Sequence, residues 1–325
     1  MNRFVTLLKR EYWEHRGGFL WAPVWSAVAL FALMAIGMLI ATWHANRTFD
    51  GEIKIGVPLM KLLSEVPPEE MAKLGLGYEA ALSGHWLILQ AVLFFVLFFY
   101  LLGALYDDRR DRSILFWKSL PVSDLETVLS KVAIAAIGAP LLAWAVTVML
   151  HFAFLGMLGL FVLGHGLSAM DLVWGPAEPL ALAAKLLATV PVNALWAMPA
   201  IGWLLLVSAF ARSKPFLWAV ALPVAVGVAI NTFELLEAVR VPDTWYWQHV
   251  VARILTSLVP ASWFGPAYIE RMERAETGGG PPEVLLDWSM IGSALGSMEL
   301  WIGVLAGVAM FAAAVYFRRN RELAD

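Results

Sequence analysis

The stretch WLILQAVLFFVLFFYLLGAL, from Trp86 to Leu105, contains twenty residues and no charged side chain. A helix of about 20 mostly apolar residues is long enough to cross a hydrocarbon core of about 30 Å. This stretch therefore predicts a membrane-spanning helix.

The composition of the whole chain points to the same class of protein. Of its 325 residues, 60% are hydrophobic and 15% are charged, and its mean hydropathy is +0.71. Soluble domains average about 45–50% apolar and about 25% charged residues. The sixteen Trp residues suit the boundary between lipid and water. These proportions exclude a soluble enzyme and a disordered hub.

Net charge and cysteine content exclude further classes. The net charge of −3 provides no field for holding a polyanion, so no nucleic-acid partner is expected. Cysteine is absent, which excludes a disulfide framework, a cysteine-based zinc site and a thiol nucleophile.

Six segments are long and apolar enough to span a membrane. In chain order they are Phe19–Trp43, Trp86–Leu105, Val132–Leu163, Leu180–Phe210, Phe216–Phe233 and Met298–Phe317. The third exceeds one crossing and contains Pro140, which predicts a tilt, a kink or a protruding end. The fourth contains Pro191 and Pro199. The predicted fold class is all-α, a polytopic membrane protein with one transmembrane domain over 1–325.

The distribution of Lys and Arg predicts the orientation. Alternate segments place fourteen of these residues on the side of both termini and eight on the other. The two short connecting segments decide the orientation, because Ala211–Pro215 is basic whereas Gly164–Pro179 contains no basic residue. We expect a multi-pass protein of a bacterial-type cytoplasmic membrane, with both termini cytoplasmic.

Residues 1–18 predict an amphipathic helix lying at the membrane surface. Its apolar face carries Phe4, Leu7, Leu8 and Tyr12. Gly17-Gly18 permits a bend into the first span. The alternative is an ordinary basic flank that only fixes the topology. A cleaved signal peptide is not expected, because the first apolar run is too long for one.

Two extracytoplasmic segments, 44–85 and 234–297, are too long to be simple turns. The first contains two plausible helices, Val57–Glu65 and Glu69–Leu82. The second contains the apolar run Val250–Ile269, which Arg253, Pro260 and Pro266 interrupt. That run predicts a short helix or a re-entrant hairpin before the last span, followed by a flexible Gly278–Pro282 loop.

Chemical motifs are scarce. The chain has no G-x-x-x-x-G-K-[ST] phosphate loop, no H-E-x-x-H pair and no G-x-S-x-G elbow. His151, the one histidine within a span, is more typical of a packed core residue than of a ligand. Asn193 and Asn231 are polar groups in costly positions, so either lines a passage or bonds to a neighbouring helix.

The segment YDDRRDRSILFWKSLPVSDLETVLSK, 106–131, is the informative cytoplasmic loop. A charge cluster precedes a short apolar run, and Pro121 then ends the helix. Ser123 and Glu126 fit a capping box, so a new helix starts there and enters the third span. Two interpretations of the apolar tip stand equal: it lies in the membrane interface, or it meets another protein.

This loop resembles that of ABC-2 type transporter permeases. The run Asp108–Ser113, the turn Lys118–Ser123 and the closing Lys131 are similar to the family's E/D-R-x-x-G-[ST] pattern, S-L-P-V-S turn and lysine. Arg112 stands where many members have glycine. The opening Leu7–Glu14, the six spans and the broken apolar segment before the last span extend the resemblance over the whole chain.

The resemblance implies a permease subunit that supplies the passage but not the energy. Such permeases pair with a second copy and bind two copies of a separate ATPase, which holds the ATP and Mg²⁺; this chain itself would need no cofactor and would not be an enzyme. Contacts with the ATPase are implied for Arg109, Arg110, Ile114, Phe116, Trp117, Lys118, Pro121, Arg212 and Lys214.

The function expected on this basis is ATP-driven export of a hydrophobic or amphipathic cargo by alternating access. An ion-gradient-driven secondary transporter is an alternative, although buried ionisable residues at mid-membrane are scarce. A membrane-embedded enzyme would need a polar cluster, and the sequence offers none. A non-transporting assembly or signalling subunit is the remaining alternative.

Overall fold

The computed structural model describes residues 3–48, 68–119, 121–233, 242, 244–259, 261–264 and 286–320. Within these ranges every regular element is a helix. Six helical segments are long and apolar enough to cross a membrane, which agrees with the six spans predicted from the sequence.

The N-terminal helix α1 (Arg3–Arg16) runs through a π-helical turn, η1 (Gly17–Trp21), into α2 (Ala22–Thr48). The bend lies at His15, whose φ of −112° and ψ of 17° are not helical. In the described part of 1–18, which starts at residue 3, the predicted helix therefore exists, but it bends just before the glycine pair. Leu7 is buried and α1 packs against α7, so part of its apolar face meets protein rather than lipid.

Helix α4 (Pro68–Gly103) corrects the prediction for the segment before the second span. Residues Glu69–Leu82 are helical as expected, but they belong to the same helix as the span itself. Proline at the first position suits a helix start, because its missing N–H would have no partner there. The predicted helix Val57–Glu65 lies outside the described residues.

The third span is one continuous helical rod. Two short helices come before it, α5 (Tyr106–Arg110) and α6 (Ser113–Ser119). The rod itself consists of three consecutive elements: α7 (Asp124–Ala133), η2 (Ile134–Gly138) and α8 (Ala139–Gly164). The π-helical turn η2 ends two residues before Pro140. Because proline has no N–H to donate, the backbone pairing must readjust there without ending the helix.

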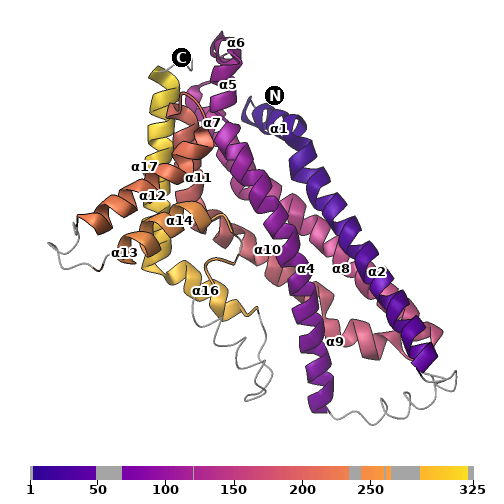
Figure 1. Cartoon of the computed structure of the whole chain (residues 1–325). Coiled ribbons are helices and arrows are strands. Elements are labelled where there is room, and N and C mark those ends of the chain that lie inside the picture. Colours follow the sequence, from indigo (N-terminus) through magenta and orange to yellow (C-terminus); the bar gives the residue numbers. More distant parts are fainter. Residues whose placement is uncertain are drawn as a thin grey trace.

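The predicted fourth span, Leu180–Phe210, is wrong as a single helix. After η3 (Met170–Trp174) and α9 (Gly175–Ala177), it is divided into α10 (Pro179–Trp196) and α11 (Met198–Phe210). Pro199 explains the break, because its ring would clash with the carbonyl four residues earlier in an unbroken helix. Figure 1 shows α10 crossing the molecule obliquely, whereas α11 stands beside the last helix.

The remaining described chain forms six elements: α12 (Pro215–Thr232), α13 (Thr244–Tyr246), η5 (Trp247–Val251), α14 (Ala252–Thr256), α16 (Trp288–Gly296) and α17 (Met298–Asn320). The predicted broken segment Val250–Ile269 is helical only as far as Thr256 in its described part. That helical run is too short to cross a membrane. Gly278–Pro282 lies outside the described residues.

Helices α11 and α17 pack most closely of all. Their backbones touch at Gly202 and Gly307, where an added Cβ on Gly202 would collide with the carbonyl oxygen of Gly307. Such close approach of small residues is typical of helix pairs in membranes. The main buried cluster extends from this pair to α4, α7 and η2.

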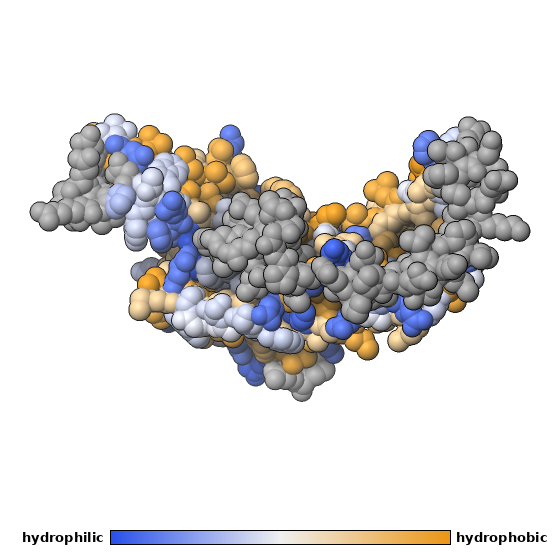
Figure 2. All heavy atoms as spheres, turned by 90° about the horizontal axis from the view of Figure 1, so that it is seen from below, coloured by the Kyte–Doolittle hydropathy of each residue, from blue (hydrophilic) through white to orange (hydrophobic). Residues whose placement is uncertain are grey.

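One end of the molecule, which we call the hairpin end, carries α1, α5, α6, α7 and the last turn of α17 (Figure 1). From the opposite end the molecule is elongated and hollowed along one side, with apolar residues lining the hollow (Figure 2). Much apolar surface is open on α2, where Trp25 is 65% and Leu39 is 69% exposed. Such a surface suits lipid or another subunit rather than water.

Candidate functional site

The short helix α6 forms the tip of the hairpin that follows the second span. Leu115 and Phe116 are exposed, at 49% and 60%. The rings of Phe116 and Trp117 meet edge to face with their centroids 5.1 Å apart. Exposure of the two apolar side chains Leu115 and Phe116 is unfavourable in water, and it indicates contact with lipid headgroups or with another protein.

The helix that returns to the membrane begins with a complete capping box, as the sequence predicts. Ser123 Oγ accepts a hydrogen bond from the backbone N–H of Glu126 at 3.1 Å. The Glu126 carboxylate accepts one from the backbone N–H of Ser123 at 2.9 Å. These bonds satisfy amide groups that a helix start leaves unpaired. The tip is thereby joined to a helical rod that continues to Gly164.

A buried arginine joins the hairpin to the last helix. Arg318 in α17 is 2% exposed and forms ion pairs with two carboxylates, Asp108 at 3.0 Å and Asp124 at 3.1 Å. Asp108 lies in α5 and Asp124 starts α7, so one guanidinium holds both arms of the hairpin. Removing one partner of such a pair leaves a buried charge uncompensated.

A second buried cluster joins the hairpin to the N-terminal helix. Lys131 Nζ lies 3.0 and 3.2 Å from the two carboxylate oxygens of Glu11. The Tyr100 hydroxyl donates to the same carboxylate at 2.8 Å. All three side chains are buried. The cluster therefore links α1, α4 and α7 at the membrane end of the hairpin.

Arg109 fixes the hairpin to the end of α11. Its guanidinium donates to the backbone oxygens of Ser208 at 2.7 Å and Ala211 at 2.9 Å. Ser208 Oγ in turn accepts from the backbone N–H groups of Leu105 and Tyr106, both at 2.9 Å. The last carbonyls of a helix have no partner within it, and a cation there also complements the helix dipole.

Two of the predicted contact residues are buried instead of exposed. Arg109 is one of the contacts implied by the resemblance, but it is 3% exposed because it caps α11. Ile114 is another of these implied contacts, but it is fully buried. Helical periodicity explains the second case: Ile114 and Trp117 share the inner face of α6, which turns Leu115 and Phe116 outward.

Trp117 and Lys118 are partly covered. The guanidinium of Arg10 lies over the Trp117 ring, 3.4 Å from its centroid, a cation–π contact. Lys118 Nζ donates to the backbone oxygen of Arg319 at 3.3 Å. These contacts hold the flank of α6 against α1 and α17, so Phe116 with Leu115 is the apolar surface that the tip leaves open.

The other predicted contact residues lie on the surface of the hairpin end. Arg110 pairs with Asp107 at 3.1 Å and with Asp111 at 2.9 Å. The Pro121 carbonyl accepts a hydrogen bond from Arg3 at 3.0 Å. The turn with the exposed Arg212 and Lys214 follows Ala211, whose carbonyl Arg109 holds, so this turn adjoins the hairpin. Whether any of them contacts a partner stays a prediction.

Asn193 and Asn231 form hydrogen bonds between segments, the second of the two roles considered for them. Asn193 Oδ1 accepts from Trp263 Nε1 at 2.6 Å, and the exposed Asn231 accepts from Trp247 Nε1 at 3.2 Å. Asn193 also lines a cavity of about 30 Å³, together with Gln90 and Ser257. That space suits a molecule no larger than water.

No group of three or more His, Asp or Glu residues in the described ranges could hold a metal ion. His151 is buried and shares a hydrogen bond of 2.9 Å with the Leu82 carbonyl, as expected for a packed core histidine.

Comparisons with protein-family models, curated proteins and solved structures found no match.

Proposed function

We propose that this chain is the transmembrane permease subunit of an ABC-2 type exporter, driven by a separate ATPase. In this proposal two copies of the chain pair around the passage and bind two ATPase subunits. The cargo is hydrophobic or amphipathic. Six membrane-length helices and a hairpin of this design support the proposal.

The observation that carries the proposal is the construction of the hairpin. Its tip presents Leu115 and Phe116 to the surroundings, whereas the rest of it is fastened by buried ion pairs and by Arg109. A surface that only rested in lipid headgroups would need no such fastening. A surface that transmits force from a moving partner needs rigid links to the helices that respond.

The mechanism follows from these links. ATP shifts the equilibrium between two conformations of the complex because it binds one of them more tightly than the other. The closing of the ATPase subunits must therefore move the permease helices. The rod from Asp124 to Gly164 carries displacement of the tip into the membrane. Arg318 and Lys131 pass the same displacement to α17 and α1.

The test is affinity purification of the tagged chain from its native membrane, with co-purifying proteins identified by mass spectrometry. We expect a polypeptide with a P-loop motif, and we expect the double variant Leu115→Glu, Phe116→Glu to lose it. Trp13→Ala removes an exposed aromatic side chain at the same end and is the matched control. Retention of the ATPase by the double variant would count against docking at the tip.

A further inference from the structure

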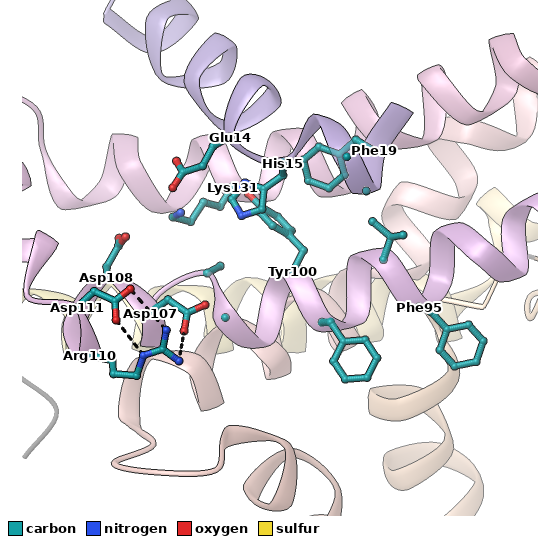
Figure 3. A pocket seen from close by; sticks show the side chains of 16 residues that line it. Glu14, His15, Phe19, Phe95, Tyr100, Asp107, Asp108, Arg110, Asp111 and Lys131 are labelled. Carbon is teal, nitrogen blue, oxygen red and sulfur yellow. Dashed lines mark hydrogen bonds and ion pairs between the residues drawn. The ribbon is translucent and has the colours of Figure 1, made fainter. Parts of the chain in front are cut away.

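A cavity of about 750 Å³ opens between the α1–η1 segment and the end of the second span at the hairpin end (Figure 3). Sites for small molecules typically measure about 300–1,000 Å³. In Figure 3 the charged side chains Asp107, Asp111 and Arg110 gather at one end of the view, and Phe19 and Phe95 lie toward the other. The cavity is therefore amphipathic along its length.

The end of the second span and the short helix after it produce this gradient. Phe95, Phe99 and Gly103 of α4 line the cavity at intervals of four residues, so successive members are neighbours along the helix, and Asp107 of α5 lines it just beyond. At 1.5 Å per residue, Phe95 and Gly103 are separated by about 12 Å along the axis of α4, and Asp107 follows beyond the end of that helix. The spacing fits a ligand with an extended apolar tail and a polar head group.

The polar end of the cavity is acidic. Its lining includes four carboxylates and two basic side chains: Glu14, Asp107, Asp108, Asp111, Arg110 and Lys131. Ion-pair partners behind the lining add two basic residues and two acidic ones: Arg10, Arg318, Glu11 and Asp124. The partners cancel one another, so the lining keeps an excess of two carboxylates over basic groups, which favours a positively charged head group in contact with it.

The wall formed by the α1–η1 segment, opposite the second span, leaves room for a ligand at Gly17. A Cβ atom on Gly17 would meet no atom within 4 Å, so this position faces open space. The backbone is irregular here, with the non-helical His15 followed by the π-helical turn η1. Such π-helical turns occur often at functional sites.

We propose that this cavity binds an amphipathic cation, a long-chain amine or quaternary ammonium compound that enters from the membrane. The tail lies along Phe95 and Phe99. The head group lies between Asp107 and Asp111 on one side and Glu14 on the other. Binding requires no ATPase, so the site stands apart from the proposed function; if that function also holds, the site names a cargo class and its point of entry.

The test is photo-cross-linking of the full-length chain in phosphatidylcholine nanodiscs. The probe is dodecyltrimethylammonium with a diazirine near the chain end, and the matched probe is dodecanoate with the same diazirine. We expect labelling of the peptides around Phe95 and Phe19 by the cation to exceed labelling by the anion about tenfold, the ratio that corresponds to about 1.4 kcal/mol.

Three variants assign the labelling to the cavity. Asp107→Asn with Asp111→Asn should remove the preference for the cationic probe, and Gly17→Leu should lower labelling by it about tenfold. Gly37→Leu adds the same side chain at another open position on the neighbouring helix and should change nothing. Equal labelling by both probes, or labelling that Gly17→Leu leaves intact, would overturn the proposal. If Gly17→Leu does not fold, the variant Asp107→Asn with Asp111→Asn is the deciding test: loss of the preference for the cationic probe supports the proposal, and a retained preference overturns it.

Discussion

Arg112 joins α5 to α6 in a left-handed backbone conformation, with a φ of 60°. Glycine adopts this region freely, whereas other L-residues pay about 1–2 kcal/mol because the Cβ approaches the carbonyl oxygen. The family pattern that this loop resembles has glycine at this position. The left-handed turn gives a physical reason for that glycine, and it identifies Arg112 as a strained departure from the pattern.

Replacing Arg112 should therefore change stability in a direction set by the new side chain. We expect Arg112→Gly to raise the free energy of unfolding by about 1 kcal/mol, and Arg112→Val to lower it by a similar amount. Thermal unfolding of the purified chain in detergent measures both. Arg212→Gly, at an exposed position whose own φ is not positive, is the control and should give no gain.

The cluster of Glu11, Lys131 and Tyr100 allows a sharper test of a buried ion pair. Lys131→Met alone leaves the Glu11 carboxylate buried without its counter-ion and should cost about 3–5 kcal/mol. The triple variant Lys131→Met, Glu11→Leu, Tyr100→Phe removes every polar member and should recover most of that loss. Thermal unfolding again provides the readout. A triple variant as unstable as the single one would show that the charges are not the cause.

The elements themselves were largely predictable, because each follows from a local pattern. Apolar runs of membrane length predicted the spans, and Ser123 with Glu126 predicted the start of α7. The fourth span was not predictable in this way, since it contains two prolines of opposite effect. Pro191 lies inside α10, whereas Pro199 starts α11 after the break, and only the tertiary packing distinguishes them.

The candidate site was less predictable than the elements. Its buried pairs join residues far apart in the chain, 120 positions for Lys131 with Glu11 and 210 for Arg318 with Asp108. Periodicity within one helix carries no information about such partners. Periodicity does carry information about α6. Ile114 and Trp117 are three residues apart, so the sequence alone was enough to place both side chains on the same face of that helix.

At the level of the element, the capping box controls the hairpin's rigidity. We expect Ser123→Ala to destabilise the first turn of α7 by about 1 kcal/mol, because the Glu126 amide loses its acceptor. Hydrogen exchange of the amides in residues 124–127 should accelerate accordingly. Ser123→Asp keeps an acceptor at the cap and is the control. Equal exchange in both variants would mean that tertiary contacts alone hold this turn.

At the level of the whole molecule, the fastenings converge on one end. Arg318, Lys131 and Arg109 tie the hairpin to α17, α1 and α11, which belong to different parts of the chain. The opposite end shows no comparable buried ion cluster among the described residues. Displacement of the tip should therefore move several spans together, as a rigid body, rather than bend a single loop.

An ATPase can move the hairpin only if the hairpin end faces the compartment that supplies ATP, and the absence of cysteine makes the orientation testable. Single cysteines at the exposed positions Ser119, Ser213 and Ser168 report the sides of the membrane. With a membrane-impermeant maleimide on intact cells, Ser168→Cys should react, because its segment has no basic residue. Ser119→Cys and Ser213→Cys should react only after permeabilisation, since basic segments stay cytoplasmic. Reaction of Ser119→Cys in intact cells would place the tip where no cytoplasmic ATPase can reach it.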